Sequence, residues 1–318
     1  MKLSDSKKYK SIAILLSSFN GVKYLEEQVC SLLKQAGNIM IDIHIRDDGS
    51  KDGTQSLIKN LSEKYPNIYL YEAINVGVIA SFLWLVDNIS GYDYYAFCDQ
   101  DDVWEPLKLM AAISKLETYD DAIPLAYCSA FQYVDCDLNH IGRFSSKTDL
   151  SIENLLIENC APGCTMVFNS ALREKYHELN VVNVSNRIVM HDWFFLLLAS
   201  CYGRVVYDEN SYLLYRQHSN NVVGIKNDLK SIIKARARQL IKELNRPQHL
   251  LYVQTKLISE ICTDALCSNS ASQLSNGFIE SQESILSRLR FVLNDNVKRV
   301  KIIDDFIFKF LYVVGYYK

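Results

Sequence analysis

Between residues 11 and 98 the sequence alternates short apolar runs with segments whose apolar residues recur every three or four positions. The apolar runs have the length of strands, and the segments between them have the spacing of amphipathic helices. The expected strands are residues 11–17, 39–45, 68–72 and 94–98, and the expected helices are residues 24–35, 53–64 and 75–86. This alternation predicts an α/β fold with a doubly wound, mostly parallel sheet that binds ligands at the carboxyl ends of its strands.

The pattern continues less regularly after residue 104. Its spacing predicts helices at residues 107–119 and 190–199, strands at 125–134 and 166–168, and an edge strand at 205–215. Asp52 is expected to cap the helix that begins at Gly53. The segment 268–277, which is rich in Ser and Asn, is expected to be a loop.

Size and charge predict two regions. A chain of 318 residues with 49% hydrophobic and 22% charged residues has the composition of a globular protein. The net charge is −3, but residues 226–318 hold 15 Lys and Arg against 9 Asp and Glu. We therefore expect a first domain at residues 1–225 and a basic, helical C-terminal region at 226–318. A nucleic-acid partner is not expected.

The sequence carries no export or membrane-spanning signal. Its first ten residues are polar and rich in lysine, and no run of 18 or more apolar residues occurs. The nine cysteines show neither CxxC pairs nor zinc-finger spacing; Cys262 and Cys267 have four residues between them and no histidine cluster beside them. We expect free, mostly buried thiols in a cytoplasmic protein.

Three carboxylates within four residues follow the apolar strand 94–98, in the sequence Asp99-Gln100-Asp101-Asp102. Like charges crowded at the end of a buried strand cost free energy unless a cation compensates them. Hard oxygen ligands suit Mg²⁺ or Mn²⁺, and these cations suit a diphosphate. The cluster indicates metal-assisted departure of a phosphate-containing leaving group, with a water-binding or helix-capping loop as the alternative.

Other polar clusters follow expected strands or begin helices. Asp47 and Asp48 lie in a turn after the second strand, where a carboxylate can accept the N3–H of a pyrimidine base; the alternative is ordinary turn chemistry. Asp192 begins a helix, as a helix cap or as a general base. His218 follows a strand, as a structural donor or as a ligand to Mn²⁺.

Taken together, these motifs resemble those of the family 2 glycosyltransferases, which have the GT-A fold. The resemblance spans about residues 11–224, and its form with CDQDDVW, HDW and RQHxNN is most similar to the bacterial rhamnosyltransferase branch. The motifs occur in order at residues 18–21, 24–28, 47–50, 75–77, 99–104, 163–166, 191–193 and 217–221.

The resemblance implies a role for each motif. Asp192 would be the general base, and Asp101 would bind Mg²⁺ or Mn²⁺ with His218 as a further ligand. The residues implied to bind the nucleotide-sugar donor are Ser18, Phe19, Asn20, Glu27, Asp47, Asp48, Asn75, Gly77, Asp99 and Gln100. Those implied to border the acceptor are Trp104, Gly163, Cys164, His191 and Trp193. One departure from the family pattern is Arg46, where valine is usual.

The implied activity is inverting, metal-dependent transfer of a sugar in the synthesis of cell-surface polysaccharide, such as cell wall, capsule or O-antigen. The best single expectation is L-rhamnose from dTDP-rhamnose, passed to a glycan acceptor that is lipid-linked. The alternatives are another donor, such as UDP-galactose or UDP-GlcNAc, or a non-catalytic protein that binds sugar nucleotides or glycans.

The C-terminal region has its own pattern. A stripe of cations recurs every four residues at Lys226, Lys230, Lys234, Arg238 and Lys242. Residues 306–317 are apolar and aromatic but too short to span a bilayer. The region is expected to dock on the anionic inner face of the plasma membrane or to form a homodimer contact, with a solvated helix face as the remaining alternative.

Overall fold

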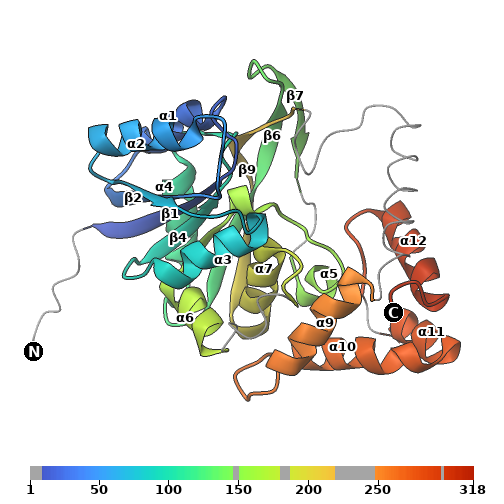
Figure 1. Cartoon of the computed structure of the whole chain (residues 1–318). Helices are drawn as coiled ribbons and strands as arrows, with labels where there is room; N and C mark the ends of the chain where they lie inside the picture. Colours follow the sequence, from blue (N-terminus) through green and yellow to red (C-terminus); the bar gives the residue numbers. More distant parts are fainter. Residues whose placement is uncertain (1–8, 146–149, 180–186, 219–247, 295–296) are drawn as a thin grey trace, which may run out of the picture.

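The computed structural model describes residues 9–145, 150–179, 187–218, 248–294 and 297–318 (Figure 1). The described residues form one nine-stranded sheet with the order β3-β2-β1-β4-β8-β6-β9-β5, and β7 pairs with β6. The strands are β1 Lys10–Ser18, β2 Ile39–Asp47, β3 Ile68–Glu72, β4 Tyr94–Cys98, β5 Val103–Trp104, β6 Leu125–Val134, β7 His140–Phe144, β8 Val167–Asn169 and β9 Arg204–Arg216.

The first four strands are parallel, and their order confirms the predicted α/β topology. β1 pairs in parallel with β2 and with β4, and β2 pairs in parallel with β3. Strand β1 is buried on both faces, which explains its continuous apolar run. Because Ser18 is in register with Asp47, and Leu16 with Cys98, the three carboxyl ends meet at one edge of the sheet.

The second half of the sheet is mixed. β8 lies antiparallel between β4 and β6, and β9 pairs in parallel with β6 and antiparallel with β5. The prediction of an edge strand at residues 205–215 therefore holds for most of β9, and it fails only at Leu213 and Leu214, where the two-residue strand β5 pairs on the outer side. The last residues of β9, Tyr215 and Arg216, pair with Tyr133 and Val134 of β6. Both are buried, and they bring the end of β9 toward the acidic cluster.

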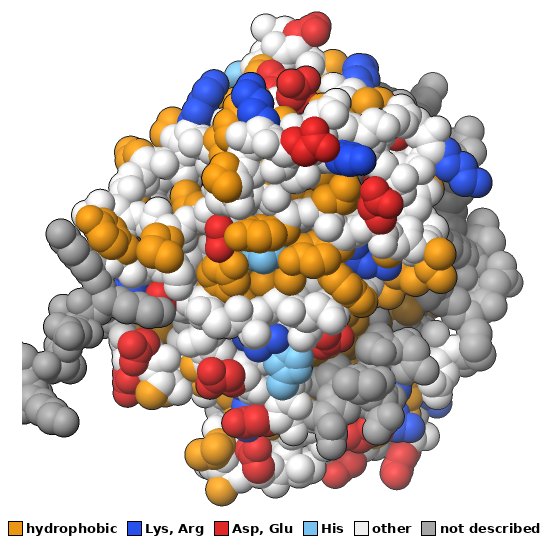
Figure 2. All heavy atoms as spheres, turned by 60° about the vertical axis from the view of Figure 1, so that its left-hand side comes forward, with side chains coloured by type: hydrophobic (Ala, Val, Ile, Leu, Met, Phe, Trp, Pro, Cys, Tyr) orange, Lys and Arg blue, Asp and Glu red, His pale blue; other side chains and the backbone are white. Residues whose placement is uncertain are grey.

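Helices cover both faces of the sheet (Figure 1). Alternate residues of β1 and β4 belong to two separate cores, one with α1, α2 and α4 and the other with α3, α6 and α7. These helices are α1 Leu25–Leu33, α2 Thr54–Lys64, α3 Val78–Asn88, α4 Lys108–Leu116, α6 Ser170–Glu178 and α7 His191–Tyr202. Along the edge formed by β3, Met40, Tyr69 and Ile74 are exposed, and Figure 2 shows hydrophobic side chains in a band on this side.

Two local predictions are wrong. The N-cap of α2 is Gly53, which adopts a φ of 97°. Asp52, one residue before the N-cap, accepts the N–H of Thr54. The segment 268–277 is largely helical, because α10 spans Asn269–Glu280. Ser268 caps this helix, and Ala271, Leu274 and Phe278 bury its apolar face.

The described C-terminal residues are helical and extend the core that contains α7. The C-terminal helices are α9 Leu250–Ile261, α10, α11 Ile285–Asn294 and α12 Ile302–Val313. One further short helix, α5 Ile152–Leu155, lies earlier in the chain. None of the helices in the described part of the chain combines the length and hydrophobicity that crossing a bilayer requires. The predicted cation stripe at residues 226–242 lies outside the described residues.

Candidate active site

The acidic cluster lies where β4 ends. Asp102 is 1% exposed, while Asp99 and Asp101 are partly exposed. Burial, together with the charges of Asp101 and Asp192, raises the pKa of Asp99 to about 7. Burial and the charges of Asp101 and Asp99 likewise raise the pKa of Asp102. The crowding inferred from the sequence is therefore present, and Asp192 contributes to it from 90 residues away in the chain.

The end of β9 completes this cluster. The backbone N–H of Arg216 donates to Oδ1 of Asp102 at 3.1 Å, and its Nε donates to the carbonyl of Asp101 at 2.9 Å. Nε2 of His218 lies 2.9 Å from Oδ2 of Asp101, and the His218 ring stacks on Tyr24 with centroids 5.2 Å apart. The structure thus brings the two residues expected to bind metal into direct contact.

The chemistry of this cluster fits a hard divalent cation. Asp101 offers a carboxylate beside an imidazole, and the buried Oδ2 of Asp102 has no hydrogen-bond partner among the described residues. Ligand atoms of Asp99, Asp102 and Cys164 also lie within 4.8 Å of one another. Burial raises the pKa of the Cys164 thiol well above its ordinary value, so the neutral thiol is a poor ligand beside these carboxylates.

Gln100 holds the loop that follows β1. Its Oε1 accepts from Oγ of Ser18 at 2.8 Å and from the N–H of Phe19 at 2.9 Å, and its Nε2 donates to the Phe19 carbonyl at 3.1 Å. A Cβ atom on Gly21 would lie 2.0 Å from the same Oε1. Gln100 therefore positions this loop with its own amide, while the Phe19 ring, 45% exposed, and Asn20 face outward.

Asp47 retains a free oxygen at the end of β2. Its Oδ1 accepts from the N–H of Ser50 at 2.9 Å and from Nε2 of Gln55 at 2.8 Å, and its Oδ2 is buried without a partner in the described part of the chain. A buried carboxylate oxygen without a donor is a position where a ligand can supply one.

Asp48 is fully occupied within the protein. It accepts the N–H of Val76 at 3.0 Å, the N–H of Gly77 at 2.9 Å, and the guanidinium of Arg46. Arg46 is 3% exposed, so this ion pair explains how a cation is tolerated where an apolar residue was expected. Asp48 thereby ties the loop after β2 to the loop of Asn75 and Gly77 that precedes α3.

Asp192 lies in the first turn of α7, whose N-cap is Met190, so the helix-cap alternative does not apply. Its Oδ2 accepts the N–H of Gly163 at 2.9 Å, and its Oδ1 accepts from Nδ2 of Asn159 at 3.1 Å. A Cβ atom on Gly163 would lie 2.9 Å from Nε2 of His191 and 3.2 Å from Cβ of Asp192. Glycine at 163 thus allows its backbone to fix the carboxylate.

Comparison with known proteins agrees with this arrangement. The family model described as "Glycosyl transferase family 2" matches residues 13–175, half of the chain. The chain belongs to glycosyl transferase family 2. Its match covers β1 through most of α6 and includes the acidic cluster and Gly163.

The sequence identity of this family 2 transferase to individual relatives is low. It is 29% identical to dTDP-rhamnosyl transferase RfbG of Shigella flexneri over 276 residues, which are 83% of this chain and 89% of the relative. It is 29% identical to the uncharacterized glycosyltransferase RP339 of Rickettsia prowazekii over 52% of each chain. The solved structure of S. aureus TarS with UDP-GlcNAc has 16% identity and a TM-score of 0.51 over 89% of this chain and 80% of that chain, which shows the shared fold.

Two residues expected at the acceptor lie inside the transferase. Trp104 is 2% exposed, and Nζ of Lys108 lies 3.5 Å from the centroid of its ring. Cys164 is fully buried. Neither side chain has surface to offer a sugar in this structure, because both belong to the core that contains α1, α2 and α4.

His191 and Trp193 flank Asp192 and are also mostly buried. The His191 ring stacks on Phe82 with centroids 4.0 Å apart, and neither ring nitrogen has a hydrogen-bond partner among the described residues. Burial lowers the pKa of His191, so the ring is neutral. Nε1 of Trp193 donates to the carbonyl of Leu155 at 2.5 Å. His191 and Trp193, which were expected to border the acceptor, therefore pack into the interior on either side of Asp192 in the sequence.

Sequence reasoning missed three supporting residues. Arg216, besides its contacts with the acidic cluster, pairs with Glu27 of α1, so Glu27 acts here through an ion pair within the protein. Asn159 fixes Asp192, and no sequence signal pointed to it. Lys108 lies fully buried on the core side of the cluster, and burial lowers its pKa to about 8.

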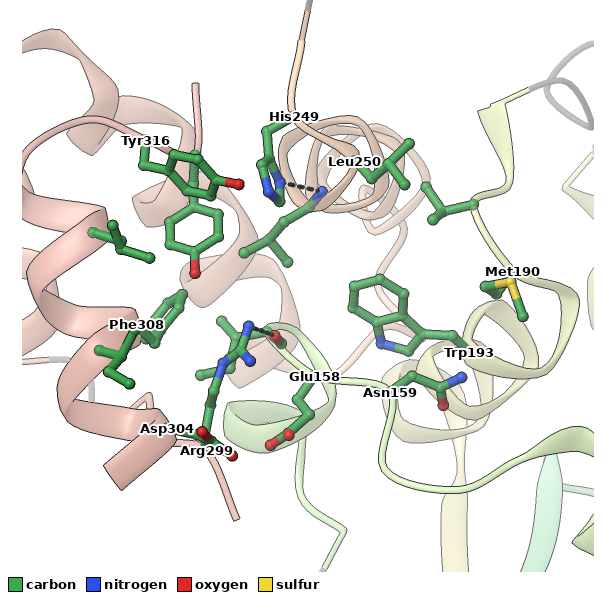
Figure 3. A pocket seen from close by; sticks show the side chains of 16 residues that line it. Glu158, Asn159, Met190, Trp193, His249, Leu250, Arg299, Asp304, Phe308 and Tyr316 are labelled. Atoms are coloured by element: carbon green, nitrogen blue, oxygen red, sulfur yellow. Dashed lines mark hydrogen bonds between the residues drawn. The ribbon is translucent and has the colours of Figure 1, made fainter. Parts of the chain in front are cut away.

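A cavity of about 430 Å³ lies beside the start of α7, where Met190 and Trp193 flank Asp192 in the sequence (Figure 3). Its lining also includes Asn159, His249 at the N-cap of α9, Leu250 of α9 and Phe308 of α12 (Figure 3). Arg299 also lines it, and the buried Nε of Arg299 and Oδ1 of Asn159 have no partner among the described residues. Aromatic faces with unused polar groups suit a small polar ligand with apolar edges.

Proposed function

We propose that the chain is an inverting, metal-dependent glycosyltransferase that moves a sugar from a nucleoside diphosphate donor to a glycan acceptor. The observation that supports it best is the position of Asp192. Its carboxylate is held by Gly163 and Asn159 and lies near enough to the end of β4 for its charge to raise the pKa of Asp99. The proposed base would therefore lie close to the proposed leaving-group site.

The proposed reaction is a single displacement. Asp192 accepts the proton of an acceptor hydroxyl, and that oxygen attacks the anomeric carbon on the side opposite the diphosphate. One displacement inverts the anomeric configuration. The hydrogen bonds from Gly163 and Asn159 orient the carboxylate, and the neutral ring of His191 adds no charge beside it.

Asp101 and His218 would hold Mg²⁺ or Mn²⁺, and Asp99 would lie toward the donor. The bound cation supplies positive charge to the departing diphosphate. At the nucleotide base, we propose that Oδ2 of Asp47, which has no partner among the described residues, accepts the N3–H of uracil or thymine beside the exposed ring of Phe19. Ser18, Asn20, Asn75 and Gly77 belong to the loops that would frame this nucleotide.

For the donor we propose dTDP-L-rhamnose, on the strength of the relative named as a dTDP-rhamnosyl transferase. The second candidate is UDP-GlcNAc, which the TarS structure contains. For the acceptor we propose that the cavity beside Asp192 receives the sugar chain beyond the attacked hydroxyl, since Asn159 contacts both the cavity and the base.

The C-terminal region 226–318 is proposed to dock on an anionic membrane surface, where a lipid-linked acceptor would be presented. On α12, Ile302, Phe306, Phe310 and Val314 recur every four residues and are 56–77% exposed. On α11, Leu286 and Leu293 are 68% and 71% exposed. Exposed apolar faces of this extent mark contact surfaces.

The substitution Asp192→Asn tests the proposed base. The amide keeps the size of the carboxylate and one acceptor oxygen but cannot take a proton, so we expect sugar transfer to fall by at least about 100-fold. Donor binding should persist, measured as thermal stabilisation by dTDP-rhamnose or UDP-GlcNAc with Mn²⁺. Asp121→Asn, an exposed aspartate between α4 and β6 that lines neither the cavity nor the acidic cluster, is the matched control.

Transfer by Asp192→Asn within tenfold of wild type would remove the assignment of the base. A wild-type protein that is stabilised by a nucleotide sugar but neither transfers nor slowly hydrolyses it would favour the alternative of a non-catalytic binding protein.

A further inference from the structure

Three cysteines from different parts of the chain lie close together, at the end of α7 and in the turn between α9 and α10. Cys201 lies near the end of α7, Cys262 follows α9, and Cys267 precedes α10. Their sulfur atoms all lie within 4.8 Å of one another. The residues are 1%, 2% and 8% exposed, and all three thiols are free. The sequence showed the pair at 262 and 267, and the fold adds the third sulfur.

Backbone contacts fix these positions. Oδ1 of Asp264 accepts the N–H of Leu266 at 3.1 Å and that of Cys267 at 2.9 Å, which shapes the turn between α9 and α10. The N–H of Ser268 donates to the carbonyl of Cys201 at 2.8 Å, which joins this turn to the end of α7. These bonds fix the main-chain segments that carry Cys201 and Cys267 next to each other.

A salt bridge lies beside the cluster. Nζ of Lys175 is 3.2 Å from Oδ2 of Asp264, whose other carboxylate oxygen accepts the N–H of Cys267. Hydrogen bonding from Cys201 is the largest influence on the pKa of Cys267 and lowers it, whereas burial and the charge of Asp264 raise it.

We propose that Cys201, Cys262 and Cys267 form a binding site for a thiophilic cation, with Zn²⁺ as the expected ion. Three thiolates at about 2.3 Å from one Zn²⁺ lie about 3.8 Å apart, within the separation seen here. Binding breaks three S–H bonds, releases the protons to solvent and forms three Zn–S bonds, while a water molecule takes the fourth position. Sulfur ligands select Zn²⁺ over the Mg²⁺ or Mn²⁺ suited to the carboxylate site.

Such a site would be structural. It would join α7, whose first turn carries Asp192, to the start of the C-terminal helices, and it uses no residue of the proposed active site. A disulfide between two of the three thiols is the competing use of the cluster, and its presence is one outcome of the test.

The test uses the full chain, purified in reductant and stripped of metal. We expect it to bind one Zn²⁺ per molecule in a chelator competition, and Co²⁺ in its place should give a thiolate-to-cobalt charge-transfer band. The double variant Cys262→Ser/Cys267→Ser should lose both signals. The control Cys30→Ser/Cys136→Ser, which removes two thiols outside the cluster, should retain both.

Three results would overturn the proposal. These are no Zn²⁺ bound by the wild-type chain, a disulfide among the three cysteines in the reductant-free protein by mass spectrometry, or equal loss of Zn²⁺ in the control variant. If the double variant fails to fold, the cobalt spectrum of the folded wild type decides, since a spectrum without sulfur ligation contradicts the site.

Discussion

His44 is a histidine that the fold keeps neutral. It is 5% exposed, its two ring nitrogens lie 2.9 Å from the Tyr71 hydroxyl and 3.0 Å from the Tyr92 hydroxyl, and its ring stacks on Tyr69 with centroids 4.8 Å apart. Burial lowers its pKa from 6.5 to about 4, although Asp42 acts in the opposite direction. The surroundings of His44 therefore stabilise the neutral imidazole relative to the charged imidazolium.

This residue predicts a pH dependence of stability. Because the pKa is lower in the folded state, the unfolded chain binds more protons between pH 4 and 6.5, so the contribution is complete above pH 6.5 and is lost as the pH falls toward 4. The full effect is about 3 kcal/mol. Urea titrations of wild type and His44→Gln should converge as the pH falls; a constant difference from pH 7 to 4 would contradict the prediction.

At the scale of elements, the turn at Gly163–Thr165 and the start of α7 act as one unit. Gly163 places its N–H on Asp192, and no side chain fits between them. The helix is buried along most of its length, so it cannot shift to relieve a clash.

The substitution Gly163→Ala should therefore displace Asp192. Its new Cβ would lie 2.9 Å from Nε2 of His191 and 3.2 Å from Cβ of Asp192. We expect transfer to fall by about 10-fold or more while donor binding is unchanged, because small displacements of a catalytic group are costly. Gly277→Ala, on α10, controls for the substitution itself, because its added atom would make only ordinary contacts with the Phe291 ring, the nearest at 3.5 Å. Full activity of Gly163→Ala would show that this contact does not set the position of the base.

The elements also show what the sequence could and could not predict. The strands at 68–72, 94–98 and 125–134 were predicted to the residue, because local apolar runs bounded by turns define them. The parallel pairing of β9 with β6 was not predicted, since it is a non-local contact. Helix α10 was missed because its polar composition concealed the apolar spacing of Ala271, Leu274 and Phe278. Within the site, Asn159 could not be predicted, as its role depends entirely on tertiary contact.

At the scale of the whole molecule, the strand ends proposed to bind the donor and the exposed C-terminal helices lie in different parts of the fold (Figure 1). The exposed apolar residues Ile302, Phe306 and Phe310 of α12 and its C-cap Val314 recur every four residues, and Lys301 and Lys318 lie at the ends of this segment. Apolar side chains beside lysines are suited to the surface of an anionic bilayer.

Liposome flotation tests this surface. The wild-type chain should float with vesicles containing phosphatidylglycerol and much less with phosphatidylcholine alone, since each nearby cation adds about 1 kcal/mol. Phe306→Glu/Phe310→Glu should remove flotation, whereas Met40→Glu, 61% exposed on β2, should not. Equal flotation of both variants would exclude this stripe as the docking face, and a concentration-dependent dimer that the double substitution disrupts would assign the stripe to self-association.

The contact between Gln100 and the loop after β1 also limits how the site can be redesigned. The amide occupies the space that a side chain at position 21 would need, within 2.0 Å of Oε1. A larger residue at 21 therefore requires the amide of Gln100 to move or a shorter residue at 100, and either change breaks the hydrogen bonds to Ser18 and Phe19. Positions 21 and 100, 79 residues apart, form a single unit of mutation. In a library of variants, changing one of the two positions alone would disrupt the loop after β1. Changing both together would allow new shapes of the proposed nucleotide pocket.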